Sequence, residues 1–234
     1  MRRRARPGAP SARGSLPAIL MVAALLGGGS GTHAAAPGPN PEQVVDRVER
    51  AYAAAADLTA TFRQTSAVAA AGQVQQATGT VAVKRPGKMR WDYLEPEPRL
   101  FVTDGKTFWA YSPEDKQVLV QEVGGALGAT PLAFLMGVGS LRKEFEVRGV
   151  RHAAAGKTAL LDLRPHRPDG AVGRLLLEVD IATSLIVQAT VFDAIGNTTV
   201  LALSDQKLNV GLPDSRFTFV PPPGVRVMQG PVGR

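Results

Sequence analysis

The chain of 234 residues contains no cysteine, is 44% hydrophobic and only 20% charged, and carries a formal net charge of +7. This length is sufficient to bury a sizeable core. The absence of cysteine excludes disulfide bonds, thiolate catalysis, Cys-ligated metal centres and the lipidated cysteine that anchors a bacterial lipoprotein.

The N-terminal segment has the composition of a secretory signal peptide. Residues 2–13 contain five arginines and no acidic residue, and residues 16–26 then form an apolar run that is followed by small residues. This order matches a basic region, a hydrophobic region and a cleavage region. The run is also shorter than the roughly 20 residues that span a membrane. We predict that a signal peptide over residues 1–36 is cleaved after Ala34 or Ala36, which releases a soluble monomer.

The signal peptide accounts for most of the net charge. Without its five arginines, the 27 basic residues fall to 22, against 20 acidic residues. A nearly balanced mature chain does not have the basic surface that nucleic-acid binding requires.

An amphipathic helix is predicted from Pro41. Asn40 is a favourable N-cap, proline is favoured at the first helical position, and Glu42 adds an acidic side chain to the first turn. Apolar side chains then recur at helical spacing, at Val44, Val45, Val48, Tyr52 and Ala55.

From about residue 58 the hydrophobic period approaches two, which is typical of strands. Turn signals recur every 8–12 residues, and Asp104-Gly105 is the clearest hairpin turn. We predict eleven strands, near residues 58–66, 77–84, 88–93, 99–103, 107–112, 117–122, 144–151, 157–164, 174–180, 185–193 and 198–206. Residues 221–224 are predicted to leave the sheet and to run along its outside.

One further segment is apolar on every side. Residues 132–136 follow Thr130-Pro131, end at Gly137, and are predicted to form a short helix that borders a hydrophobic space. Leucine and methionine in this segment suit repacking around variable apolar ligands. The pattern predicts a single domain over residues 37–234, mainly β (α+β), with a large antiparallel sheet and short helices.

The sequence offers little catalytic chemistry. His152 and His166 lack metal-ligand spacing, and neither a nucleophile elbow nor a phosphate-binding loop is present. We therefore predict no enzyme, no metal and no cofactor. An exported hydrolase that uses Asp92 or Glu95 is an alternative, which a wet polar cleft around these carboxylates would support.

Several segments carry the motifs of one known family, in collinear order from about Pro41 to Met228. They are residues 83–93, Pro96, residues 103–109, Tyr111, residues 130–132 and residues 216–222. In these segments the chain resembles the outer-membrane lipoprotein carrier family (LolA).

The resemblance implies an unclosed antiparallel β-barrel of about eleven strands, whose apolar concave face is covered by short helices. It implies a periplasmic carrier in a Gram-negative bacterium. Such a carrier takes the acyl chains of lipoproteins from an inner-membrane ABC-type releasing complex and delivers them to an outer-membrane receptor. The receptor is itself anchored through a lipidated cysteine, so this chain resembles the carrier and not the receptor.

The resemblance also assigns roles to residues. Arg85 matches an arginine whose contacts close a helical lid over the cavity, and its expected lid contacts are Tyr52, Leu135 and Met136. The expected lining of the acyl cavity consists of Val48, Phe62, Met89, Trp91, Phe108, Leu132 and Phe134.

Two alternative functions are compatible with the same predicted sheet. The first is a periplasmic carrier of another acylated or hydrophobic small molecule, because an apolar cavity does not specify which apolar ligand it binds. The second is a stress-sensing or scaffold domain built on the same sheet.

Overall fold

The computed structural model describes residues 40–70, 72–123, 140–152, 156–167 and 171–230. The chain divides into two units, Met1–Ala36 and Pro37–Arg234, and every described residue belongs to the second. The expected signal peptide with its cleavage site, and the apolar segment with Leu132, Phe134, Leu135 and Met136, lie outside the described residues. These interpretations therefore remain predictions.

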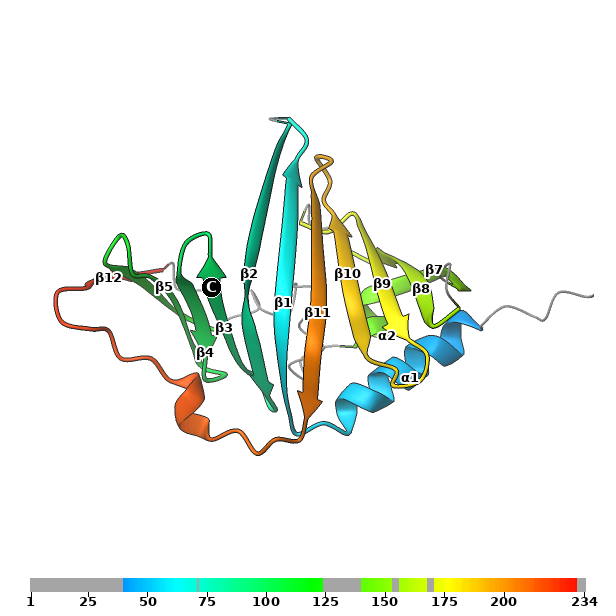
Figure 1. The fold of residues 1–234 in the computed structure, drawn as a ribbon, viewed down its shortest axis with the longest axis horizontal. Coiled ribbons are helices and arrows are strands. Elements are labelled where there is room, and N and C mark those ends of the chain that lie inside the picture. Colours follow the sequence, from blue (N-terminus) through cyan, green and yellow to red (C-terminus); the bar gives the residue numbers. More distant parts are fainter. Residues whose placement is uncertain (1–39, 71, 124–139, 153–155, 168–170, 231–234) are drawn as a thin grey trace, which may run out of the picture. The chain divides into compact units, whose positions relative to one another are not determined.

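The second unit is built on one twelve-stranded sheet with the order β12-β6-β5-β4-β3-β2-β1-β11-β10-β9-β8-β7 (Figure 1). Among the described strands, β12 and β7 lie at opposite ends of this order and do not pair with each other, so the sheet is unclosed. The strands are β1 (Asp57–Val68), β2 (Gln73–Lys84), β3 (Lys88–Glu95), β4 (Arg99–Thr103), β5 (Thr107–Ser112), β6 (Gln117–Glu122), β7 (Phe145–His152), β8 (Thr158–Pro165), β9 (Arg174–Asp180), β10 (Ile186–Phe192), β11 (Thr198–Leu208) and β12 (Arg226–Gln229).

All eleven predicted strands are confirmed, and so is the unclosed, mainly β architecture. The twelfth strand, β12, was missed, and it pairs with β6 in parallel, whereas the other pairs are antiparallel. All four residues of β12, Arg-Val-Met-Gln, are exposed. Their side chains do not alternate between apolar and polar, so the sequence gives no sign of a strand here. The pairing of β12 depends on the path of the chain that precedes it.

Helix α1 (Pro41–Ala53) begins as the sequence predicts. The Asn40 side-chain oxygen accepts hydrogen bonds from the backbone N–H groups of Glu42 at 3.0 Å and Gln43 at 3.4 Å. The helix contacts β7 and β8, and its apolar side is buried against the sheet through Val44, Val45, Val48 and Tyr52. We call the face of the sheet that α1 covers the inner face.

Strand alternation supplies the inner face with its core. Leu161 and Leu163 of β8 and Leu175 and Leu177 of β9 are fully buried in the same apolar cluster as α1. Successive side chains of a strand point to opposite faces, so every second residue of these strands enters the core. Burying one such leucine side chain contributes about 2 kcal/mol to folding.

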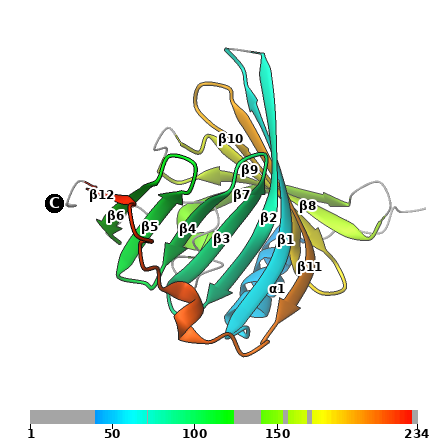
Figure 2. The same ribbon diagram turned by 60° about the vertical axis from the view of Figure 1, so that its left-hand side comes forward.

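The outer face of β2 to β5 is covered by residues 209–225, which we call the C-terminal strap (Figure 2). Phe217, in the 3-10 helix η2 (Asp214–Phe217), is fully buried against Ala82. The ring of Phe219 lies 5.0 Å from that of Tyr111. The chain therefore leaves the sheet after β11 and runs along its outside from residue 209. The prediction gave this course to residues 221–224 alone, which lie within the strap.

Ion pairs hold the strap at its 3-10 helix. The Asp214 carboxylate lies 2.6 Å from the Lys84 ammonium and 2.7 Å from the Lys88 ammonium. Hydrogen bonds from these two lysines lower the pKa of Asp214 to about 2. The Lys84 ammonium also donates to the backbone oxygen of Leu212 at 2.7 Å.

The start of the strap is held by a buried carboxylate. Asp57, the first residue of β1, is 4% exposed and accepts hydrogen bonds from the backbone N–H groups of Val210, Gly211 and Leu212 at 2.7–2.9 Å. The start of β1 and the start of the strap therefore meet at one residue, which follows the end of α1 by four positions.

We expect Asp57→Ala to lower the free energy of unfolding by about 3 kcal/mol, because it leaves three backbone donors without their charged acceptor. Urea denaturation measures the change. The control is Asp104→Ala, which removes a turn carboxylate that accepts from the N–H groups of Lys106 and Thr107. This turn is more exposed, so its loss should cost no more than about 1 kcal/mol. Equal losses would contradict the role given to Asp57.

Candidate functional site

The inner face carries a row of five aromatic side chains on β1, β3, β4 and β5. Ring centroids lie 4.8 Å apart for Phe62 and Trp91, 4.8 Å for Phe62 and Tyr93, 5.6 Å for Tyr93 and Phe101, and 6.3 Å for Phe101 and Phe108. We call these five residues the aromatic row. Aromatic rings at such separations attract each other beyond the effect of burial, so the row forms a continuous apolar surface.

Burial changes along the aromatic row. Phe62 is 1% exposed and belongs to the core beneath α1, and Trp91 is 9% exposed. Tyr93, Phe101 and Phe108 are only partly buried. The row thus extends the packed core into an apolar surface that remains partly accessible.

Gly79 of β2 makes room for the row. It lies between Phe62 of β1 and Tyr93 of β3 in the sheet register, beside an irregularity in the β2–β3 pairing. A Cβ atom at this position would lie 2.0 Å from the backbone oxygen of Asp92 and 2.7 Å from the Phe62 ring. Only glycine therefore lets the Phe62 ring lie across β2.

The predicted cavity residues that fall within the described chain lie on the inner face, except Val48, which packs onto this face from α1. Val48 and Phe62 belong to the packed core, Trp91 lies at its border, and Met89 packs against it. Phe108 forms the end of the aromatic row. That these side chains line a ligand cavity remains a prediction.

The predicted lining of the acyl cavity did not include two members of the row, Tyr93 and Phe101. A signal was available for both, because Tyr93 stands two positions after Trp91 on the same strand and Phe101 pairs with Trp91 across β3 and β4. The register that joins them to Phe62 and Phe108 arises only in the sheet.

Arg85 lies directly after β2, at the end of the sheet where α1 gives way to β1. Its backbone N–H donates to the backbone oxygen of Ala56 at 2.9 Å. The side chain is half-buried, and this burial lowers the pKa of its guanidinium. The role of Arg85 as a lid latch remains a prediction.

Tyr52 fastens the C-terminal end of α1 to the sheet. Its hydroxyl accepts a hydrogen bond from the Ile186 backbone N–H at 3.0 Å and lies 3.5 Å from the side-chain oxygen of Gln206, to which it donates. Burial raises the pKa of Tyr52 to about 12. Tyr52 thus connects α1 with β10 and β11, while its expected contact with Arg85 remains a prediction.

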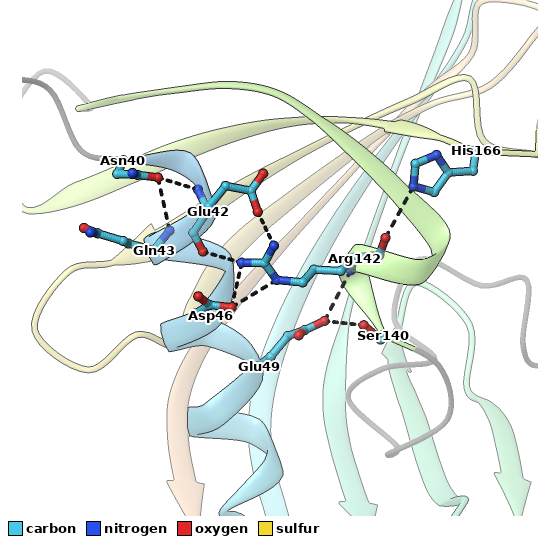
Figure 3. Close-up of polar contacts among 8 residues, drawn as sticks. All are labelled: Asn40, Glu42, Gln43, Asp46, Glu49, Ser140, Arg142 and His166. Carbon is cyan, nitrogen blue, oxygen red and sulfur yellow. Dashed lines mark hydrogen bonds and ion pairs between the residues drawn. The ribbon is translucent and has the colours of Figure 1, made fainter.

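Arg142 fastens the N-terminal half of α1 to the short helix α2 (Leu141–Glu144), as Figure 3 shows. Its guanidinium forms an ion pair with Glu42 and donates to Asp46 at 2.6 and 3.0 Å. The Glu49 carboxylate accepts from the Ser140 hydroxyl at 2.7 Å and from the Arg142 backbone N–H at 3.3 Å. Hydrogen bonding to Asp46 raises the pKa of Arg142. The sequence did not single out this cluster, because its members lie about 100 residues apart.

The carboxylates of the hydrolase alternative do not gather around a cleft. Asp92 accepts hydrogen bonds from the Arg90 guanidinium at 2.8 Å, and it alternates with Trp91 and Tyr93, so it faces away from the aromatic row. Glu95 is exposed. Within the described ranges, no group of three or more His, Asp or Glu side chains could hold a metal ion.

No helix in the described part of the chain is long and apolar enough to cross a membrane.

The model of the family described as "Outer membrane lipoprotein carrier protein LolA" matches residues 53–220, which is more than half of the chain. The chain belongs to this family. Two proteins named "Outer-membrane lipoprotein carrier protein" are similar to it over most of their length. The protein from Chromobacterium violaceum is 34% identical over 74% of this chain and 81% of its own. The protein from Pseudomonas aeruginosa is 30% identical over 90% of this chain and 97% of its own.

A solved structure shares the fold of this family member. The crystal structure of an uncharacterized conserved protein from Thermus thermophilus aligns with a TM-score of 0.54 over 81% of this chain and 98% of that chain. Sequence identity in this alignment is 15%, so the similarity supports the architecture alone.

We expect Gly79→Ala to lower the free energy of unfolding by about 1–3 kcal/mol, because the new methyl group displaces either the Phe62 ring or the β3 backbone. Urea denaturation measures this loss, and the near-ultraviolet circular dichroism of Trp91 reports the disturbed ring packing. The control is Gly149→Ala in β7, where a Cβ atom meets nothing within 4 Å. A similar loss in both variants would contradict this account of Gly79.

Proposed function

We propose that this protein is a periplasmic carrier that binds the acyl chains of lipoproteins and moves them between the inner and outer membranes. The observation that carries the proposal is the aromatic row, an apolar surface on the inner face whose outer members are only partly buried. Membership of the lipoprotein carrier family supports the same assignment.

The physical need for such a carrier follows from the hydrophobic effect. Each CH₂ group of an acyl chain that is exposed to water costs about 0.8 kcal/mol, so a lipoprotein with long chains does not cross an aqueous compartment unaided. A carrier replaces the membrane with an apolar protein surface for the duration of the transfer. Binding and release involve no covalent step, so this function requires neither a catalytic residue nor a cofactor.

The two ends of the route follow from the same proposal. The carrier receives lipoproteins from an inner-membrane ABC-type releasing complex and passes them to an outer-membrane receptor. The predicted signal peptide over residues 1–36 would bring the chain to the periplasm. The sheet then holds the acyl chains against its inner face while the polar remainder of the lipoprotein stays in water.

Arg85 is proposed as the latch of the empty carrier. Its guanidinium offers five donors and no acceptor, and it lies beside the junction of α1 and β1. Hydrogen bonds from a charged donor are worth about 1.5–3 kcal/mol each. A latch of this strength holds a lid closed and yields to an incoming hydrophobic chain.

The carrier function predicts saturable binding of an environment-sensitive apolar dye to the folded protein, with competition by a triacylated lipoprotein. Phe108→Ala should weaken dye binding several-fold, because it removes an exposed part of the aromatic row. Trp109→Ala is the matched control, since the neighbouring residue on β5 points to the outer face. Fluorescence titration measures both. If dye binding is not saturable, side chains fill the inner face and leave no room for a ligand, and the proposed carrier function is rejected.

Arg85→Leu should impair delivery to the receptor more than it impairs folding or lipoprotein uptake. Leucine removes the charge-assisted hydrogen bonds and adds apolar surface. The equilibrium therefore shifts from the closed, empty form toward the loaded form. Arg85→Lys should restore delivery in part, because it keeps the charge and loses the planar fork. An assay with purified partners scores release from the inner membrane and delivery to the receptor separately. Normal delivery by the leucine variant would reject the latch.

A further inference from the structure

The aromatic row leads into a pocket of about 630 Å³ at the end of the sheet where β3 turns into β4. Tyr93 and Phe101 belong to both the row and the pocket. We call this space the head pocket. Its lining includes Gln64, Ser66, Gln75, Tyr93, Arg99 and Phe101. Its volume lies in the range of pockets that bind small molecules.

The polar groups of the head pocket are held in place by one another. The Tyr93 hydroxyl donates to the side-chain oxygen of Gln64 at 2.9 Å, and the Gln64 amide nitrogen donates to the Ser66 hydroxyl at 3.2 Å. Burial raises the pKa of Tyr93, so its phenol stays neutral and remains a donor. The Gln64 amide group has two hydrogens, and within the described chain one of them has no partner. A fixed amide donor is therefore available to a ligand.

Among the pocket residues that the structure describes, the one cation, Arg99, is paired with a carboxylate at the pocket rim. The Arg99 guanidinium lies 2.8 Å from the Glu97 carboxylate, and Glu97 also lines the pocket. The remaining polar groups are neutral amides and hydroxyls. An anionic group that entered the pocket would meet the Glu97 carboxylate and would have to displace it to pair with Arg99.

We infer that the head pocket binds the neutral ester and amide groups through which acyl chains join a lipoprotein, and that it discriminates against phospholipids with the same chains. This inference rests on the proposed carrier function. An acyl chain that lies along the aromatic row reaches the head pocket over Tyr93 and Phe101, so its ester carbonyl arrives beside the Gln64 amide. An ester carbonyl accepts a hydrogen bond and carries no charge, which matches this lining.

The test compares two probes with the same acyl chains. The first is a synthetic dipalmitoylglyceryl-cysteine peptide with an acetylated amino end and an amidated carboxyl end, and the second is dipalmitoyl phosphatidylglycerol. Competition with a fluorescent apolar dye gives both affinities. We expect the wild-type protein to bind the lipopeptide about tenfold more tightly, because one additional well-made hydrogen bond is worth about 1.4 kcal/mol, which is tenfold in affinity.

Two substitutions separate the head pocket from the aromatic row. Gln64→Leu should reduce the preference for the lipopeptide to about twofold, because it removes the amide donor and keeps an apolar side chain of similar size. Glu97→Gln should strengthen phosphatidylglycerol binding several-fold, because it releases the charge of Arg99. Thr65→Val is the matched control on β1, since the neighbouring residue points to the opposite face. Tyr93→Phe, which keeps the ring, replaces Gln64→Leu if the latter does not fold.

The outcomes distinguish this inference from the proposed function. If the wild-type protein binds neither probe, the carrier function fails. If it binds both probes equally, or if Gln64→Leu weakens both to the same extent, the carrier function stands and the selectivity of the head pocket is overturned. A preference for phosphatidylglycerol in the wild-type protein would overturn it too, and would indicate that Arg99 exchanges Glu97 for the phosphate.

Discussion

A single sheet with apolar side chains on both faces must have each face covered, and this constraint governs the rest of the structure. Helix α1 covers the inner face over β7 and β8, and the C-terminal strap covers the outer face of β2 to β5. The buried carboxylate of Asp57 ties the strap to the start of β1, four residues after the end of α1. The strap is thus fastened at a residue close in the sequence to the end of α1, although the two covers lie on opposite sides of the sheet.

The function that we propose uses a property that most sheets avoid. The aromatic row continues the core beneath α1 and then becomes partly accessible at Tyr93, Phe101 and Phe108. Exposed aromatic surface of this kind normally marks a binding site. Gly79 permits the close packing of Phe62 at the inner end of the row, so the apolar surface is anchored to the rigid part of the sheet.

Polar contacts fasten α1 at both of its ends. Arg142 holds the N-terminal half through the carboxylates of Glu42 and Asp46, and Tyr52 holds the C-terminal end through β10 and β11. The Arg142 contacts are exposed to solvent, whereas Tyr52 is buried. Exposed ion pairs contribute little to stability, so the polar contacts contribute less at the Arg142 end of α1 than at the Tyr52 end.

Local patterns in the sequence determined much of this protein. The cap at Asn40, the helical spacing from Val44 to Tyr52 and the eleven alternating strands depend on neighbouring residues, and the structure confirms them. The collinear motifs were likewise sufficient to identify the family. Such features can be predicted from the sequence because they follow from the preferences of the backbone over a few residues.

The tertiary structure alone decided the features that join distant segments. β12 has no internal pattern and exists because the strap brings it beside β6. Arg142 meets Glu42 across about 100 residues, and Asp57 meets the strap across more than 150. The aromatic row and the head pocket depend on register between strands, and a shift of one residue would turn each side chain to the opposite face. Sequence spacing does not specify these contacts, because they are set by the closure of long loops and by the packing of the complete sheet.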